Sequence, residues 1–361
     1  MKGLILSGGR GTRLRPLTYT SAKQLIPIAN RPILFYAIDA LAAAGVTDIG
    51  VVTGETGPEV EAAVGDGSRF GVHITYIPQG APLGLAHAVQ VSQPFLGDSD
   101  FVMYLGDNLV RRGIVPIVDT FKSSGPDALI LLARVAEPRQ FGVAEFENGR
   151  LCRLVEKPQA TTSDLALVGV YVFTKSVFAA IDAIEFSARG ELEITDAIQR
   201  MIDTGRRVDA HVITEPHQAR VATWKDTGRL EDVLEANRLV LDEIAPKIDI
   251  AIPDGVRVEG KVVIEPGAQL CDCVVRGPAI IGMGARIESA FIGPYTAVSD
   301  QCVVRNAELE NSILLHGSVV EDVDGRIDSS LIGKGCVVRR TQARPKTHKL
   351  LLGDQSCVEM S

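Results

Sequence analysis

Short β-branched segments recur about every six residues in the last third of the chain. They run from Ile264 to Leu270, from Ile281 to Ile287 and from Ile332 to Val338, and several of their isoleucines are followed directly by glycine. A six-residue period gives one flat β face per repeat, and three such faces close one coil. The pattern predicts a left-handed parallel β-helix over 254–361, with a small β-sandwich as the alternative.

The repeats are not uniform along this region. Their register slips between 287 and 292 and again around Glu321–Arg326, where we expect loops or imperfect coils. The final segment, Thr347–Ser361, is expected to pack across the last coil as a cap.

The preceding part of the chain alternates predicted strands and helices. Strands are expected at 3–6, 49–53, 73–77, 101–105 and 128–133, and helices at 32–44, 58–63, 85–92, 194–202 and 230–241. This order predicts an α/β catalytic domain over 1–245, with a Rossmann-like, mostly parallel sheet covered on both faces. A β-rich insertion over 143–173, with a hairpin turn at 147–150, is expected to wall a pocket. Ligands of such sheets bind at the carboxyl ends of the strands.

The loop after the first predicted strand concentrates glycine and positive charge. Gly8, Gly9 and Gly11 occur within four residues, and the first 38 residues hold six basic side chains and no acidic one, in a chain of net charge −8. Glycine lets backbone N–H groups approach an oxyanion, and nearby cations stabilise a polyphosphate. The loop therefore indicates a phosphate site. A plain tight turn is the alternative, but it leaves the charge segregation unexplained.

Two other glycine-rich phosphate loops are excluded by the residues themselves. No Gly-Lys-Ser or Gly-Lys-Thr occurs in the chain, so the loop is not of the Walker A type. The dinucleotide pattern G-x-G-x-x-G begins at Gly9 and Gly11 but has Leu14 at its third glycine position. It also lacks the acidic residue expected about 20 residues later.

The composition narrows the class of function further. A chain of 361 residues with 46% hydrophobic residues is long enough for two domains with substantial cores. A net charge of −8 argues against nucleic acid or an anionic membrane as the main partner. No apolar run reaches the roughly 18–20 residues of a membrane span. Six cysteines without a CxxC pair indicate reduced thiols, and we expect a cytoplasmic protein.

The glycine-rich loop also resembles the signature of a known family. The segments Gly8-Gly9-Arg10-Gly11-Thr12-Arg13-Leu14-Arg15-Pro16 and Ser21-Ala22-Lys23-Gln24-Leu25 are similar to those of sugar-1-phosphate nucleotidylyltransferases, above all to the long glucose-1-phosphate thymidylyltransferases with an added C-terminal domain. The resemblance continues through 79–88, 105–108, 156–158, 190–197 and 224–230. It implies transfer of a thymidylyl group from dTTP to glucose 1-phosphate, which gives dTDP-glucose and pyrophosphate for deoxysugar biosynthesis.

The resemblance also implies roles for the residues that would bind the nucleotide. Lys23 would lie near the attacked α-phosphate, and the carboxamide of Gln79 could pair with a pyrimidine edge, while Gly84 would let the ring approach the backbone. His87 is expected to support the site rather than react. The predicted nucleotide-binding residues are Leu6, Gly8, Gly9, Gly11, Thr12, Arg13, Gln79 and Gly84, and the predicted catalytic residues are Arg13, Lys23, Asp107 and Lys157.

The sugar and the metal are assigned in the same way. The predicted sugar-binding residues are Gly142, Glu156, Lys157, Gly169, Tyr171 and Glu193. Asp107 follows a buried strand, Asp226 matches the second aspartate of the family, and the two are the predicted ligands of Mg²⁺. As alternatives, Asp107 could cap a turn, Asp226 could be a helix N-cap, and Glu193 could serve as charge at a helix terminus.

One segment departs from the family pattern, and other functions stay open. The link at 214–223 is longer and more polar than expected and could form a flap near Asp226. The alternatives are a uridylyltransferase or another sugar-1-phosphate nucleotidylyltransferase, a β-helix acyltransferase, for which only His316 is available before the tail, and a non-catalytic regulatory paralogue. The residues alone do not separate thymine from uracil. Flat β-helix faces lead us to expect a homo-oligomer.

Overall fold

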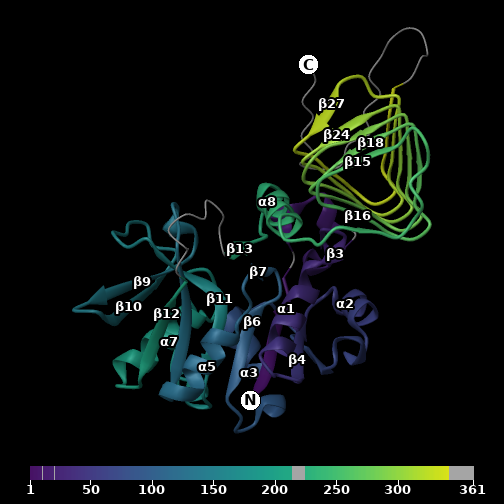
Figure 1. The fold of residues 1–361 in the computed structure, drawn as a ribbon. Coiled ribbons are helices and arrows are strands. Elements are labelled where there is room, and N and C mark those ends of the chain that lie inside the picture. The colour runs from purple at the N-terminus through teal and green to yellow at the C-terminus, as the bar shows by residue number, and fades with distance from the viewer. Residues whose placement is uncertain (10, 20, 214–223, 341–361) are drawn as a thin grey trace. The chain divides into compact units, whose positions relative to one another are not determined.

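The computed structural model describes residues 1–9, 11–19, 21–213 and 224–340. They form two compact units (Figure 1). The first unit comprises Met1–Arg10, Ser21–Leu25 and Ile33–Asp226, and the second comprises Gly11–Thr20, Ile26–Pro32 and Thr227–Ser361. This division differs from the predicted limits of 1–245 and 254–361, because α8 (Leu230–Leu241) and two early segments lie with the β-helix. The predicted flap at 214–223 and the cap at Thr347–Ser361 lie outside the described residues.

A nine-stranded sheet forms the centre of the first unit. Its order is β10-β9-β11-β6-β1-β4-β5, with β8 paired to β11 and to β12. β1, β4, β5 and β6 run parallel, whereas β9, β10 and β11 add an antiparallel part at the predicted insertion. The strands are β1 (Lys2–Ser7), β4 (Asp48–Thr53), β5 (His73–Pro78), β6 (Phe101–Leu105), β8 (Ala128–Arg134), β9 (Gly142–Glu147), β10 (Arg150–Glu156), β11 (Leu165–Phe173) and β12 (Val208–Val212).

Helices cover both faces of this sheet because its strands are apolar on both sides. In β1, Leu4 and Leu6 pack into one core with α3, α6 and α7, while Ile5 points into the other core with α1, α2 and α5. Near-continuous apolar strands are typical of a sheet that is buried on both faces. The helices are α1 (Ile33–Ala43), α2 (Gly57–Val64), α3 (Leu85–Val91), α4 (Gln93–Leu96), α5 (Val115–Ser124), α6 (Ser176–Ile181) and α7 (Ile194–Asp203).

Two short pairings complete the first unit. The β9–β10 hairpin turns at Asn148 and Gly149, whose φ angles of 50° and 77° fit the left-handed turn predicted there. β7 (Asn108–Val110) pairs antiparallel with β13 (Trp224–Asp226). No helix among the described residues combines the length and the apolar character needed to cross a membrane.

The second unit contains the predicted left-handed parallel β-helix. Three parallel sheets of six, five and five strands stack coil upon coil, and their inward side chains form one apolar core (Figure 1). The six-stranded face consists of β14 (Lys247–Ile248), β16 (Val262–Ile264), β19 (Ala279–Ile281), β22 (Thr296–Val298), β25 (Ile313–Leu314) and β28 (Leu331–Ile332). The other two faces consist of β15 (Arg257–Glu259), β18 (Val274–Arg276), β21 (Phe291–Ile292), β24 (Glu308–Glu310) and β27 (Arg326–Asp328), and of β17 (Gln269–Cys271), β20 (Arg286–Glu288), β23 (Val303–Arg305), β26 (Val319–Glu321) and β29 (Val337–Arg339).

The two predicted irregularities of the repeat have different outcomes. Between β20 and β21 the chain turns through residues 289–290, and the corner between β23 and β24 is equally short, so the slip at 287–292 is a regular corner. Between β26 and β27 four residues, 322–325, form the same corner, and the predicted loop near Glu321–Arg326 is therefore present.

The outer surface of the six-stranded face is apolar and covered. Ile280, Ala297 and Ile313 pack in one cluster with α8 and with Leu14 and Ile26 from the two early segments. These early segments include the hairpin of β2 (Pro27–Ile28) and β3 (Arg31–Pro32). The second half of the glycine-rich signature is therefore held by the β-helix unit.

Two asparagines fasten that hairpin. Asn237, which is fully buried in α8, accepts a hydrogen bond from the Ala29 N–H at 2.8 Å and donates one to the Tyr295 carbonyl at 3.0 Å. Asn30 donates to the Val298 carbonyl at 2.7 Å and accepts from the Ser299 hydroxyl at 3.1 Å. Buried amides with satisfied partners of this kind fix one arrangement of the backbone.

Candidate active site

The carboxyl ends of three parallel strands bring the predicted nucleotide-binding residues to one edge of the sheet. Gly8 follows β1, Gln79 follows β5 and Asp107 follows β6. A Cβ placed on Gly8 would lie 3.1 Å from Oε1 of Gln79, and one placed on Gly9 would lie 3.7 Å from Cε of Lys23. The glycine pair thus lies between the carboxamide and the ammonium group, where a side chain would occupy the space of a ligand.

Lys23 and Asp107 form an ion pair at this edge. The Lys23 ammonium donates to Oδ2 of Asp107, and both side chains are largely buried. Burial alone would raise the pKa of Asp107, but the charge and hydrogen bond of Lys23, together with the Asn108 amide, hold that pKa below its usual value. The carboxylate is therefore ionised and already faces a cation.

Asn108 links this carboxylate to β13. Its amide nitrogen donates to Oδ1 of Asp107 at 3.1 Å, and its amide oxygen accepts from the Trp224 indole N–H at 2.6 Å. The strand register pairs Asn108 with Asp226 across β7 and β13. Asp226 is thus the cross-strand partner of the residue that follows Asp107. The backbones of the two predicted metal ligands therefore lie close together.

The loop 79–84, which holds the predicted base-binding residues, is joined to the start of α7 through the backbone of Leu192. Leu192 N donates to the Leu83 carbonyl at 2.8 Å, and the Leu192 carbonyl accepts from Ala86 N at 3.1 Å. Gly84 has a φ of 106°, and a Cβ there would lie 2.4 Å from the Leu192 carbonyl oxygen. The requirement for glycine at position 84 thus has a structural cause other than an approaching base. A side chain there would collide with Leu192, the residue that precedes Glu193.

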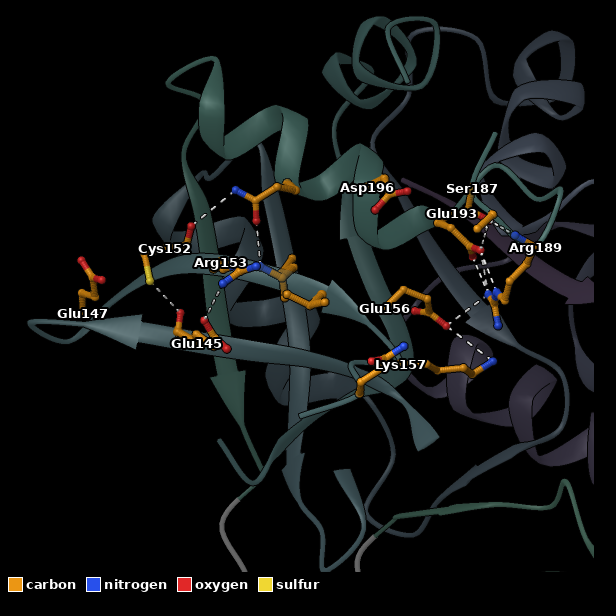
Figure 2. Close-up of a pocket in the computed structure, with 15 residues that line it drawn as sticks. Glu145, Glu147, Cys152, Arg153, Glu156, Lys157, Ser187, Arg189, Glu193 and Asp196 are labelled. Atoms are coloured by element: carbon orange, nitrogen blue, oxygen red, sulfur yellow. Dashed lines mark hydrogen bonds and ion pairs between the residues drawn. The ribbon is translucent and has the colours of Figure 1, made fainter. Parts of the chain in front are cut away.

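A pocket of 930 Å³ lies beside α7 and β10 (Figure 2). Glu156 ends β10 and Lys157, whose φ is 42°, follows it, and both residues line the pocket. Strained backbone of this kind occurs preferentially at functional sites. The charged residues that line the pocket are Glu145, Glu147, Arg153, Glu156, Lys157, Arg189, Glu193 and Asp196.

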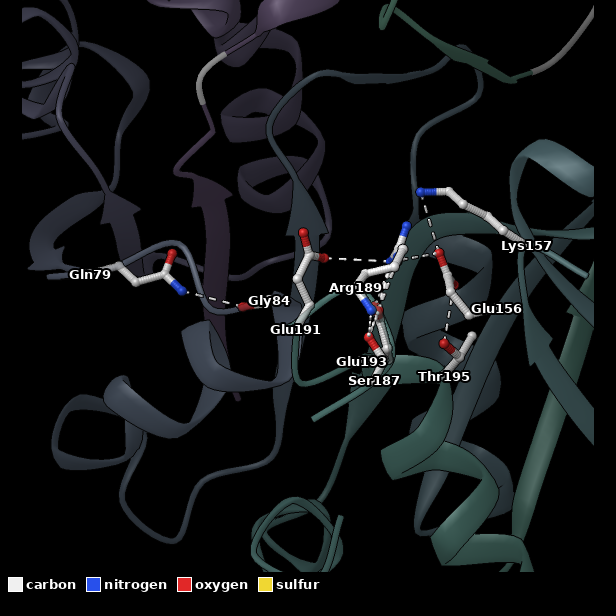
Figure 3. Close-up of polar contacts among 9 residues, drawn as sticks. All are labelled: Gln79, Gly84, Glu156, Lys157, Ser187, Arg189, Glu191, Glu193 and Thr195. Carbon is white, nitrogen blue, oxygen red and sulfur yellow. Dashed lines mark hydrogen bonds and ion pairs between the residues drawn. The ribbon is translucent and has the colours of Figure 1, made fainter. Parts of the chain in front are cut away.

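Arg189 holds the two predicted sugar-binding carboxylates together (Figure 3). Its Nη2 donates to Glu193 at 2.7 Å and to Glu156 at 3.3 Å. Burial would lower the pKa of Arg189, but the hydrogen bond and charge of Glu193 and the charge of Glu156 raise it. Ser187 also donates to Glu193 at 2.9 Å, and Thr195 donates to Glu156 at 3.1 Å. These hydrogen bonds hold both carboxylates in fixed orientations.

Glu193 precedes α7, but its side chain does not cap that helix. The carboxylate makes no hydrogen bond to the first turn and is instead used by Arg189 and Ser187. The side chain is only 5% exposed. Nearby, burial and then the charges of Glu193 and Glu156 raise the pKa of Asp196. The carboxylates that line the pocket are those of Glu145, Glu147, Glu156, Glu193 and Asp196, and carboxylate oxygens can accept hydrogen bonds from hydroxyl groups.

Four other predicted site residues are closely packed or buried, namely Gly142, Gly169, Tyr171 and Leu6. A Cβ on Gly142 would lie 3.1 Å from Oε2 of Glu156, and one on Gly169 would lie 2.6 Å from Leu105. Tyr171 is 3% exposed, and burial and then the charge of Glu156 raise its pKa. Leu6 is 7% exposed. Tyr171 is not among the residues that line the pocket, and its role as a sugar contact stays a prediction.

Gly11, Thr12 and Arg13 belong to the second unit. Gly11 has a left-handed φ of 57° and begins the short 3₁₀ turn Thr12–Leu14. The Thr18 hydroxyl donates to the Gly11 carbonyl at 2.7 Å and closes the loop upon itself. Thr12 and Arg13 are exposed, whereas Leu14 is buried in the cluster with α8. Both polar side chains are thus available to a ligand.

The residues present fit a divalent cation. Asp107 and Asp226 supply hard oxygen ligands, and the ammonium of Lys23 shows that Asp107 accepts a cationic neighbour. Among the described residues no group of three His, Cys, Asp or Glu side chains could hold a metal. Two carboxylates together with phosphate oxygens are the usual set for Mg²⁺ at phosphate substrates.

Sequence reasoning missed two residues that the structure brings into these networks. Arg189 is the only basic residue in the segment Ser187–Glu193, where it stands beside Glu191 and Glu193, and this charge pattern could have marked it. Trp224 lies in a recognised motif, but its hydrogen bond to Asn108 has no signal in the sequence.

Comparison with known proteins decides the family. The model of the nucleotidyl transferase family matches residues 2–243. The chain belongs to this family. Over the whole chain it is 49% identical to a glucose-1-phosphate thymidylyltransferase of Streptomyces griseus, all of which is covered. It is 50% identical to one of Streptomyces antibioticus, of which 99% is covered.

A solved structure shows the same relation. It is described as a glucose-1-phosphate thymidylyltransferase from Bacillus anthracis in complex with sucrose, and it is 34% identical with a TM-score of 0.62. The match covers 68% of this chain and 98% of that chain. The predicted nucleotidyltransferase fold and the recognised family are therefore confirmed.

Proposed function

We propose that this chain transfers a thymidylyl group from dTTP to glucose 1-phosphate and releases pyrophosphate. Relatives with this name are about half identical over the full length. The observation that carries the proposal is the Gly8–Gly9 loop between Gln79 and the Lys23–Asp107 pair, with the acidic pocket joined to it through Leu192. Base, phosphate and sugar each have a set of groups that suits them.

The reaction needs positioning and charge neutralisation more than proton transfer. An oxygen of the sugar phosphate, already an anion, attacks the α-phosphorus, and the bond from that phosphorus to the β-phosphate oxygen breaks. No general base is required, because the nucleophile carries no proton at neutral pH. Lys23 would stabilise the charge that develops on the α-phosphate, and Arg13 would bind the leaving pyrophosphate.

In the pocket, Glu156 and Glu193 would accept hydrogen bonds from sugar hydroxyl groups. Lys157 lies 3.5 Å from Glu156, so it could reach a phosphate attached to the bound sugar. Asp107 and Asp226 would hold Mg²⁺, which would neutralise charge on the triphosphate when bound. A homo-oligomer and a cytoplasmic location stay predictions.

Pyrophosphate release with Mg²⁺ and glucose 1-phosphate tests the proposal, with dTTP, UTP, CTP, ATP and GTP offered in parallel. We expect the highest kcat/KM with dTTP, a lower value with UTP and no turnover with purine nucleotides. A preference for UTP would retain the chemistry and make the chain a uridylyltransferase. Silence with all five nucleotides would overturn the proposal.

A further inference from the structure

The carboxamide of Gln79 is held in one orientation by two neighbours. Its Nε2 donates to the Gly84 carbonyl at 3.3 Å and lies 3.0 Å from Nδ1 of His87 in α3 (Figure 3 shows the first contact). A carbonyl oxygen can only accept, so the nitrogen of the amide must face this side. The orientation therefore follows from chemistry and not from the shape of the side chain, which is nearly symmetric.

The state of His87 follows from that orientation. Because Nε2 of Gln79 donates, Nδ1 of His87 must accept, and the neutral imidazole carries its proton on the other nitrogen. Both amide hydrogens of Gln79 are then used. Its Oε1 lies on the opposite side, 3.1 Å from the position of a Cβ on Gly8, at the loop where the nucleotide is expected.

We propose that His87 determines base specificity by fixing Gln79 with its hydrogen-bond acceptor toward the nucleobase. This inference rests on the proposed function. Thymine and uracil present an N3–H donor to such an acceptor, whereas cytosine presents a lone pair at N3. Two acceptors that face each other leave both groups unsatisfied. His87 thus excludes cytosine, while the thymine methyl group is left to other contacts.

The test compares nucleotides that differ in the base alone. For the wild-type chain and for His87→Phe, kcat/KM is measured with dTTP and with dCTP, and again with UTP and CTP. Phe keeps an aromatic ring but has no acceptor, so the Gln79 amide can turn over. We expect the dTTP:dCTP ratio to fall by about 5- to 150-fold, the factor that corresponds to one unsatisfied buried group. The UTP:CTP ratio should fall by a similar factor.

Three further variants separate specificity from folding. His87→Gln retains an acceptor and should keep both ratios near those of the wild type, while His87→Leu should repeat the effect of Phe. On the same helix, the Gln90 side chain donates to Asp182 and not to Gln79. The variant Gln90→Leu should therefore leave the ratios unchanged. Thermal unfolding of each variant shows whether it is folded.

The outcomes distinguish this inference from the proposed function. If the wild type turns over dTTP and discriminates against dCTP, but His87→Phe and His87→Leu keep the full ratio, His87 does not set specificity. If the wild type does not turn over dTTP at all, the proposed function and this inference are both wrong. Loss of the ratio in the two apolar variants, with the ratio kept in His87→Gln, supports the inference.

Discussion

The Lys23–Asp107 pair lies in the folded core, and we propose that it also takes part in the reaction. A buried carboxylate is costly unless a cation lies beside it, and Lys23 supplies that cation. The same ammonium would face the α-phosphate during the reaction. Removing it therefore affects both stability and turnover, and the two effects can be measured separately.

We expect Lys23→Met to abolish most of the turnover and to lower the free energy of unfolding by about 1–3 kcal/mol, because Asp107 loses the charge and the hydrogen bond of the Lys23 ammonium. The measurements are pyrophosphate release and urea unfolding. The double variant Lys23→Met/Asp107→Asn should recover stability without activity. Full turnover in Lys23→Met would contradict the assigned role.

At the scale of the element, the predicted site residues are positioned by short segments whose backbone conformation is fixed by close contacts. The loop 79–84 is held against Leu192 by backbone hydrogen bonds. Gly84 permits both the positive φ of 106° and the close approach to Leu192, because a Cβ there would lie only 2.4 Å from the Leu192 carbonyl oxygen. The predicted strands and helices of the catalytic part could be read from periodicity, because each is long and strongly patterned. The contact of this loop with Leu192 could not, since it joins residues more than 100 positions apart in the sequence.

Gly84→Ala tests that loop. We expect a loss of about 1–3 kcal/mol in stability and a raised KM for dTTP, because a Cβ strains the backbone and displaces Leu192. Gly80→Ala is the matched control, since nothing lies within 4 Å of its added Cβ. Denaturant unfolding and initial rates measure both, and equal behaviour of the two variants would argue against the contact.

The β-helix core contains a thiol that reports on its integrity. Cys273 is buried, and burial raises its pKa from an ordinary thiol value of 9.0 to about 11. A raised folded pKa gives stability that is fully present below pH 9 and is lost as the pH rises toward 11.

We therefore expect wild-type stability to fall more steeply with pH across that window than the stability of Cys273→Ala. Cys271→Ala, two positions away and exposed, should retain the wild-type slope. Chemical unfolding at successive pH values measures the slopes. Identical slopes for wild type and Cys273→Ala would show that the thiol is not buried in solution.

The compact unit of the β-helix includes α8 and two early segments of the chain. A repeat with a six-residue period identified the β-helix, because each coil uses only local contacts. Nothing in that period shows that its six-stranded face is covered by α8 and by residues from 11–20 and 26–32. Such contacts join the two ends of the chain, and their apolar partners are indistinguishable from ordinary core residues.

Removal of 254–361 should therefore do more than alter assembly. Without the β-helix, Leu14, Ile26 and the apolar side of α8 lose their partners, and we expect loss of pyrophosphate release together with aggregation. A chain that ends at residue 340 keeps every described coil and is the control. A chain that ends at 253 with full activity and an unchanged unfolding temperature would show that the early segments do not need the β-helix.

Attack of the sugar phosphate on the α-phosphorus can be tested by following oxygen atoms through the reaction. The chain is incubated with Mg²⁺, dTTP and glucose 1-phosphate that carries ¹⁸O in its phosphate. The masses of the products are then measured by mass spectrometry. Attack of the sugar phosphate on the α-phosphorus predicts that all label is found in dTDP-glucose, with one unlabelled pyrophosphate formed for each. Label in a sugar diphosphate formed alongside dTDP, or no dTDP-glucose at all, would show that the sugar phosphate does not attack the α-phosphorus.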